Sequence, residues 1–215
     1  MTSDLSLYLV TDSGLAAAAG HDLVELVRAA AADGVTAVQL REKEATARGF
    51  LDTVLRVSEA IPDRVALIVN DRVDVFLAAR AAGARITGVH VGQSDLPPEA
   101  VRGLIGSDAV LGLSASTPEQ LAAASDSGVV DYVGIGALHA TATKRDAPPP
   151  LGHEEFARLV ALSALPAVAI GGVHAADLGA LRRAGAAGAA VVSAICAAAD
   201  PGRAARELRT AWDAA

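Results

Sequence analysis

Short continuous runs of Val, Ile, Leu and Ala alternate with stretches of helical period along the whole chain. Runs that are apolar throughout, rather than alternating apolar with polar, are typical of parallel strands buried on both faces. Roughly eight such strand–helix units predict a (β/α)₈ barrel. A doubly wound open sheet is the structural alternative that periodicity alone does not exclude. The predicted strands are Leu7–Val10, Ala37–Leu40, Ala66–Val69, Gly88–Val91, Val110–Leu113, Tyr132–Ile135, Ala167–Ile170 and Ala189–Val192.

Helix boundaries are marked by residues that start or stop helices. Proline favours the first helical turn, and glycine favours the position just past the end. Pro98, Pro118 and Pro201 therefore mark starts, and Gly34, Gly83, Gly128 and Gly185 mark ends. The predicted helices are Asp22–Ala32, Phe50–Ala60, Val73–Ala81, Pro118–Ala124, Glu154–Leu162, Asp177–Ala184 and Arg203–Trp212.

Composition narrows the class of protein. With 215 residues, 52% hydrophobic and 3% aromatic, the chain has enough aliphatic surface for one core, so we expect a single domain over residues 1–215. A net charge of -7 argues against nucleic acid or an anionic membrane as partner. The lone Cys196 excludes an internal disulfide and fits a reducing compartment.

Targeting signals also bear on location. The first residues lack the basic and apolar regions of a signal peptide. Glycine and serine interrupt the Ala-rich segment Ala184–Ala199, which we interpret as core rather than a membrane span. We expect a cytoplasmic protein with small-molecule substrates, and the sequence leaves a homo-oligomer open.

Charged residues follow the predicted strands and indicate a polyphosphate site. Asp71 and Asp95 each come just after a strand, and carboxylates of this kind bind Mg²⁺ together with substrate oxygens. Arg41, Lys43 and Lys144 could neutralise the remaining phosphate charge. For Asn70-Asp71 the competing interpretation is a turn or helix cap, because a helix follows.

The second strand ends in Gln39-Leu40-Arg41-Glu42-Lys43. Strand alternation directs Gln39, Arg41 and Lys43 to one face, where they could bind a diphosphate and a ring heteroatom. The alternative is an exposed strand end with a surface pairing between Glu42 and Lys43.

A second phosphate site is predicted at the last strands. Loops after the seventh and eighth strands of such barrels often bind phosphate through backbone N–H groups. Gly171-Gly172 and Val192-Ser193 stand at these positions, although Gly-Gly could also be a plain turn. In the loop before the seventh strand, Thr141, Thr143 and Lys144 offer two hydroxyls and an ammonium group; the alternative is an ordinary solvated loop.

These stretches together resemble the thiamine phosphate synthase family over almost the full length. The matching motifs are "LYLVTD", "VQLREK", "NDRVDV", "GVHVGQSDLP", "LGLSAST", "DYVGIGALHATATKRDAPPPLG", "AIGGV" and "AVVSAI". The resemblance implies a (β/α)₈ barrel that couples hydroxymethylpyrimidine diphosphate to a thiazole phosphate, with Mg²⁺, by dissociative substitution.

The resemblance also implies a role for each matching residue. Asp71 and Asp95 would hold Mg²⁺, and Arg41, Lys43, Lys144 and Ser114 would be catalytic. Pyrimidine diphosphate contacts are expected at Gln39, Arg41, Lys43, Asn70, Ser114 and Lys144. Thiazole phosphate contacts are expected at Thr141, Thr143, Gly172, Val192 and Ser193.

The chain departs from the family pattern at three places. His139 stands where an aromatic is usual, and Ser116 where relatives often carry His. Extra residues around Gly83–Thr87 predict an extended or kinked helix before them. A related thiazole tautomerase is the nearest competing activity, but it uses the histidine missing at 116. The sequence also leaves open a non-catalytic regulatory phosphate-binding barrel and a phosphate-handling isomerase.

Overall fold

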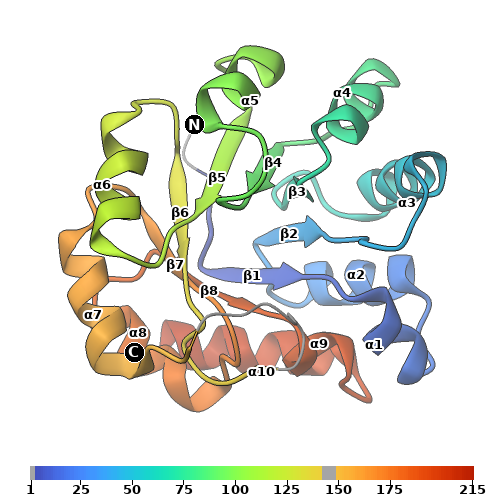
Figure 1. Cartoon of the computed structure of the whole chain (residues 1–215). Coiled ribbons are helices and arrows are strands. Elements are labelled where there is room, and N and C mark those ends of the chain that lie inside the picture. Colours follow the sequence, from blue (N-terminus) through green and yellow to red (C-terminus); the bar gives the residue numbers. More distant parts are fainter. Residues whose placement is uncertain (1–2, 142–148) are drawn as a thin grey trace.

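The computed structural model describes residues 3–141 and 149–215 and contains a closed barrel of eight parallel strands in the order β1 to β8. The ring closes because β8 pairs with β1, with Tyr8 opposite Ala190. Helices surround the strands on the outside (Figure 1). The predicted (β/α)₈ barrel is therefore confirmed, and the open sheet is excluded.

The strands lie close to where the apolar runs predicted them. Four of the predicted ranges agree at both ends, and β3 and β5 each extend by one residue, to Asn70 and Ser114. The strands are β1 Leu7–Val10, β2 Ala37–Leu40, β3 Ala66–Asn70, β4 Gly88–Val91, β5 Val110–Ser114, β6 Tyr132–Ile135, β7 Ala167–Ala169 and β8 Gly188–Val191.

The helices α5, α6 and α10 begin at the prolines that the sequence predicted as starts, Pro98, Pro118 and Pro201. The side chains of Asp22, Thr46 and Thr117 accept backbone N–H groups at the starts of α2, α3 and α6. The helices are α1 Ser13–Ala18, α2 Leu23–Ala32, α3 Ala47–Ala60, α4 Val73–Ala81, α5 Pro98–Ile105, α6 Pro118–Asp126, α7 Gly152–Leu162, α8 Leu178–Arg183, α9 Ser193–Cys196 and α10 Pro201–Asp213, with a 3₁₀ turn η1 at Ala175–Asp177.

The helix predicted at Val73–Ala81 is confirmed at both ends as α4, but the expectation that extra residues would extend it is wrong. The extra residues around Gly83–Thr87 do not lengthen α4, which ends at Ala81. Gly83 has a φ of +84°, a left-handed conformation that glycine adopts at low cost, and the chain leaves the helix there. The additional residues therefore form a loop before β4. The short helices α1 and α9 were not predicted.

Apolar side chains form two clusters separated by the strand layer. A small cluster inside the barrel includes Tyr8, Ile68 and Tyr132, and a larger one fills the space between strands and helices. The segment interpreted as core from the sequence forms β8 and α9, and Cys196 in it is buried. Among the helices in the described part of the chain, none combines the length and apolarity needed to cross a bilayer.

Candidate active site

The residues expected to bind substrate lie at one end of the barrel. All eight strands run in parallel, so residues that follow strand ends are brought to the same rim. The described members of the set are Gln39, Arg41, Lys43, Asn70, Asp71, Asp95, Ser114, Thr141, Gly172, Val192 and Ser193. Two predicted residues, Thr143 and Lys144, lie outside the described residues.

Asp71 and Asp95 face each other at this rim. Burial, the nearby Asp95 charge and a hydrogen bond to Asp95 raise the pKa of Asp71 to about 6, while Lys43 and Asn70 act in the opposite direction. The backbone N–H of Gly92 donates to the Asp95 carboxylate at 2.7 Å, which holds that side chain in place. The sequence prediction that these two carboxylates lie together is therefore confirmed.

The carboxylate pair fits a divalent cation. Two carboxyls in contact repel each other when both are ionised, and an oxygen-only donor set with free positions for water and substrate is what Mg²⁺ prefers. Asp71 also has a φ of +60°, which is rare for a residue with a side chain and is found at functional sites more than elsewhere. Its role as a metal ligand stays a prediction.

The helix-cap interpretation of Asn70-Asp71 fails. The residue before α4 is Arg72, and it makes no side-chain capping bond. The Asn70 side chain instead hydrogen-bonds the Asp71 carboxyl. Neither residue therefore caps α4, and their role at the rim of the barrel stays a prediction.

The end of β2 places its polar residues at different depths. Gln39 is buried, with 4% of its surface exposed, whereas Arg41 is half-buried and Lys43 is exposed. Glu42 accepts a hydrogen bond from the Ser13 hydroxyl at 2.8 Å, which differs from the surface pairing with Lys43 that the sequence left open. Substrate contacts at Gln39, Arg41 and Lys43 remain predictions.

A chain of hydrogen bonds crosses the barrel interior from Gln39 to Ser114. The Gln39 amide donates to the Tyr8 hydroxyl at 3.0 Å, and this hydroxyl lies 2.8 Å from that of Tyr132. The Tyr132 hydroxyl is 2.9 Å from His90 Nδ1, and His90 Nε2 is 3.0 Å from the Ser114 hydroxyl. His90 is a buried residue of the barrel interior, since 8% of its surface is exposed.

Sequence reasoning missed this chain of hydrogen bonds, although it selected both of its ends. Tyr8 and Tyr132 stand at inward-facing positions of their strands. The alternation of side chains between the two faces of a strand was the only sequence signal for this placement. Burial raises the pKa of Tyr132 well above its usual range, so the hydroxyl stays protonated and able to donate. Space for these side chains comes from Gly112, where a Cβ would overlap both the Tyr132 ring and His90 Nδ1.

The Gly171-Gly172 turn packs tightly against the loop after β6. Both residues have positive φ, and a Cβ on Gly172 would lie 2.9 Å from that of His139. The His139 N–H donates to the Gly171 carbonyl at 2.9 Å. Glycine is thus required here for packing, whether or not its backbone binds phosphate. Val192 follows β8, the next strand along the barrel, and Ser193 begins α9.

Ser116 has a structural partner that explains its presence. Its hydroxyl donates to the Gly136 carbonyl at 2.6 Å and accepts the Gly136 N–H at 3.3 Å. The side chain that replaces the histidine of the related tautomerase therefore ties β5 to the end of β6.

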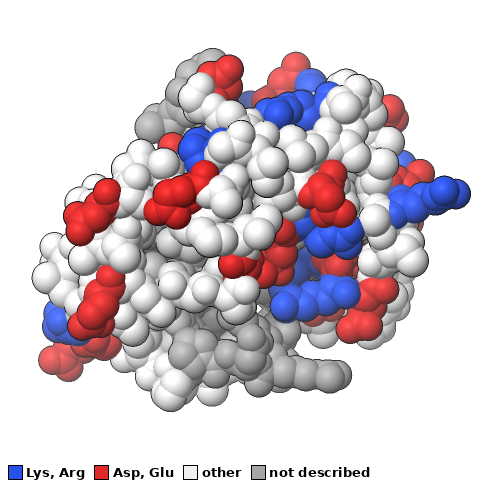
Figure 2. Space-filling view, turned by 45° about the horizontal axis from the view of Figure 1, so that its top comes forward, with Lys and Arg blue, Asp and Glu red and all other residues white. Residues whose placement is uncertain are grey.

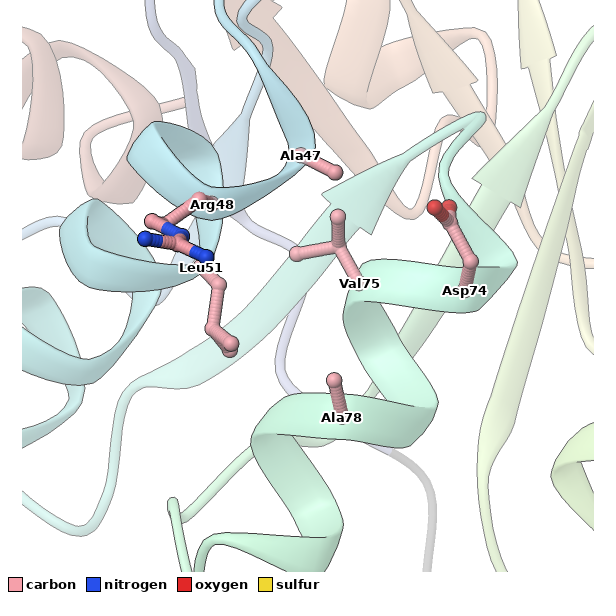
Figure 3. Close-up of a pocket in the computed structure, with 6 residues that line it drawn as sticks. All are labelled: Ala47, Arg48, Leu51, Asp74, Val75 and Ala78. Carbon is pink, nitrogen blue, oxygen red and sulfur yellow. The ribbon is translucent and has the colours of Figure 1, made fainter.

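Two hollows lie elsewhere in the fold. One, between the outer helices α3 and α4, is lined by Ala47, Arg48, Leu51, Asp74, Val75 and Ala78 (Figure 3). The other is at the amino-terminal end of the barrel, beside Leu5 and Asp131. Neither contains a residue predicted to bind substrate. On the face in Figure 2, Lys and Arg side chains lie beside Asp and Glu side chains rather than forming one continuous basic area.

Comparison with known proteins gives a consistent result. The family model described as thiamine monophosphate synthase matches residues 7–195. Thiamine-phosphate synthases from Azorhizobium caulinodans and Corynebacterium efficiens are 51% and 43% identical, over 96% and 98% of this chain and 94% and 96% of theirs.

Solved structures agree. One described as thiamine phosphate pyrophosphorylase from Pyrococcus furiosus superimposes with a TM-score of 0.86 and 31% identity, covering 99% of this chain and 97% of the other. A 3-hexulose-6-phosphate synthase at 20% identity and a TM-score of 0.70 shares the fold, over 96% of this chain and 99% of the other. The chain belongs to the thiamine monophosphate synthase family.

Proposed function

We propose that this protein is a cytoplasmic thiamine-phosphate synthase, a transferase that joins hydroxymethylpyrimidine diphosphate to hydroxyethylthiazole phosphate or its carboxylated form. The reaction releases diphosphate and, from the carboxylated form, carbon dioxide as well. The observation that carries the proposal is the Asp71–Asp95 pair at the rim of a barrel whose sequence matches the family over residues 7–195. A binder of a single monophosphate would not need two carboxylates in contact.

The residues divide the work by position. Asp71 and Asp95 would hold Mg²⁺, which when bound neutralises charge on the diphosphate. Arg41 and Lys43, which follow β2, and Lys144, which comes after β6 in the sequence, would stabilise the negative charge that develops as the methylene C–O bond breaks. Ser114 and Asn70, at the ends of β5 and β3, would orient the pyrimidine and its diphosphate.

The second substrate would bind across the rim. Thr141 and Thr143, with Gly172, Val192 and Ser193, would hold the thiazole phosphate so that the ring nitrogen faces the pyrimidine methylene carbon. Diphosphate would leave first with the electron pair of the C–O bond, and the electron-rich aminopyrimidine would support the resulting cation. The thiazole nitrogen would then attack the methylene carbon with its lone pair to form the new C–N bond. Such a reaction depends on holding two substrates together and on leaving-group electrostatics, so it needs no general base.

The tautomerase alternative is less well supported. Such a reaction needs a proton acceptor beside the thiazole, and the hydroxyl of Ser116, at the position of the tautomerase histidine, is bonded to the Gly136 backbone.

The proposal is tested by incubating the protein with both substrates, with and without Mg²⁺, and measuring thiamine phosphate and diphosphate. We expect both products in equal amounts only with Mg²⁺, and little turnover by Asp71→Asn or Asp95→Asn. Conversion of one carboxythiazole tautomer to the other, with no coupling, would favour the tautomerase. If the double variant keeps full activity, the assigned metal ligands are wrong.

A further inference from the structure

Two histidines and one aspartate meet at a point that the proposed reaction does not use. His139 lies after β6, His153 in the first turn of α7, and Asp177 in η1. The Nε2 atoms of His139 and His153 each lie 3.0 Å from the same oxygen, Oδ1 of Asp177. Among the described His, Cys, Asp and Glu residues, these three have ligand atoms that all lie within 4.8 Å of one another.

The spacing of these atoms suits a transition-metal ion. Bonds from Zn²⁺ to imidazole nitrogen and carboxylate oxygen are about 2.0–2.2 Å long, which puts tetrahedral ligand atoms about 3.3 Å apart. The observed 3.0 Å separations therefore need only a small outward movement of each ring. The two imidazole rings meet edge to face, at an interplanar angle of 86° and a centroid distance of 5.4 Å. Both can thus direct a nitrogen at one point without stacking.

The carboxylate of this group is buried and the two imidazoles are partly exposed, as in a metal site that is open to solvent on one side. The Asp177 side chain is 9% exposed, whereas those of His139 and His153 are 36% and 45% exposed. The second oxygen of Asp177 accepts the backbone N–H of His174 at 2.8 Å, which fixes the carboxylate with Oδ1 turned toward the histidines. An ion could enter from the solvent side and keep a water ligand there.

We propose that this chain binds a divalent transition-metal ion, with Zn²⁺ as the representative, through His139 Nε2, His153 Nε2 and Asp177 Oδ1. Nitrogen donors separate this site from the Asp71–Asp95 pair, since imidazole favours Zn²⁺ and Co²⁺ whereas a carboxylate-only set favours Mg²⁺. His139 precedes the "TATK" motif and His153 follows it, so a bound ion would fasten both flanks of that motif to η1.

The competing explanation is a purely structural set of hydrogen bonds. In that case both imidazoles carry a proton on Nε2 and donate to one carboxylate oxygen. The hydrogen-bond explanation predicts no stoichiometric ion, so binding measurements separate the two. These measurements do not involve turnover, and their outcome is independent of the proposed synthase activity.

The test uses the full chain stripped of metal with a chelator and titrated with Zn²⁺, then with Co²⁺, in an excess of Mg²⁺ of about 5 mM, which occupies sites that prefer oxygen ligands. We expect one equivalent of Zn²⁺ and the strong visible absorption of four-coordinate Co²⁺. His153→Gln, at an exposed side chain, should weaken binding at least about tenfold, and His139→Gln should do the same.

Two matched controls define specificity. His21→Gln removes an imidazole that bonds the Ala198 carbonyl instead, and Asp71→Asn removes a ligand of the other site. Both should leave Zn²⁺ affinity unchanged. The proposal is overturned if no stoichiometric Zn²⁺ binds, if His153→Gln and His139→Gln bind as well as the parent, or if Asp71→Asn abolishes binding.

Discussion

Replacing Asp71 by Asn should stabilise the metal-free protein while it removes the response to Mg²⁺. The pKa of Asp71 is raised from 3.8 to about 6, chiefly by burial and then by Asp95. A raised carboxyl pKa means that the ionised form is disfavoured in the folded state, so ionisation of Asp71 at neutral pH lowers the free energy of unfolding. Asn has nearly the same shape without the charge, and it tolerates the φ of +60° at this position.

The size of the effect follows from the pKa. A rise from 3.8 to about 6 corresponds to at most about 3 kcal/mol. Water screens this half-buried group, so we expect about 1 kcal/mol. Folded and unfolded chains are both protonated below about pH 4, so the penalty is absent there. It grows between about pH 4 and 6, where only the folded carboxyl keeps its proton, and it is complete above pH 6.

Thermal unfolding in chelator measures this directly. About 1 kcal/mol should raise the Tm of Asp71→Asn by about 2–4 °C at pH 8, and by much less at pH 4.5. Mg²⁺ should raise the Tm of the parent protein and leave that of the variant unchanged.

Asp74→Asn is the matched control. The hydrogen bond from Arg72 lowers the pKa of Asp74, so removing the Asp74 carboxylate should not stabilise the protein. A lower Tm for Asp71→Asn at pH 8, or an equal rise at both pH values, would refute the reasoning.

Three further predictions concern the barrel interior and its rim. Gly112→Ala should destabilise the protein by about 3 kcal/mol or more in urea unfolding, because a Cβ would overlap Tyr132 and His90. The control Gly103→Ala, in an open part of α5, should be neutral or stabilising. Equal results for the two variants would contradict the packing argument. Tyr132→Phe should lower the free energy of unfolding by about 1–2 kcal/mol, because His90 loses a hydrogen-bond partner. It should also raise KM for the pyrimidine diphosphate more than it lowers kcat, since His90 then holds Ser114 less firmly. An unchanged KM in steady-state kinetics would count against this connection between Tyr132 and Ser114. Ser116→Ala should lose about 1 kcal/mol by the same unfolding measurement, and no loss would mean that the bond to Gly136 contributes little.

Local sequence signals were sufficient for the barrel and for one part of the site. Continuous apolar runs predicted the strands because both faces of each strand are covered, by the interior cluster and by the helices. Asp71 and Asp95 could be paired in advance because they follow adjacent parallel strands. The end of α4 at Ala81 was predicted, with Gly83 as its stop. The place of the extra residues before β4 was not, because sequence length alone does not say whether added residues join a helix or follow it.

Other features depend on contacts between distant segments, for which the sequence has no local signal. Tyr8 and Tyr132 are 124 residues apart, yet their hydroxyls meet because β1 and β6 face each other across the barrel. His139, His153 and Asp177 come from a loop, a helix and a 3₁₀ turn, and no periodicity in the sequence connects them.

The interior hydrogen bonds also explain how a core with few aromatics supports a polar rim. Closed barrels of this size are filled by inward side chains, and aliphatic residues alone would leave Gln39 and Ser114 without support. Gly112 makes room for Tyr132 and His90, whose polar atoms then satisfy one another at depth. Tyr132 and His90 therefore fill the barrel interior and also hold the rim residues in place. Rim residues that are held in this way lose less conformational freedom when a substrate binds. The proposed reaction, driven by leaving-group electrostatics, would require this form of preorganisation.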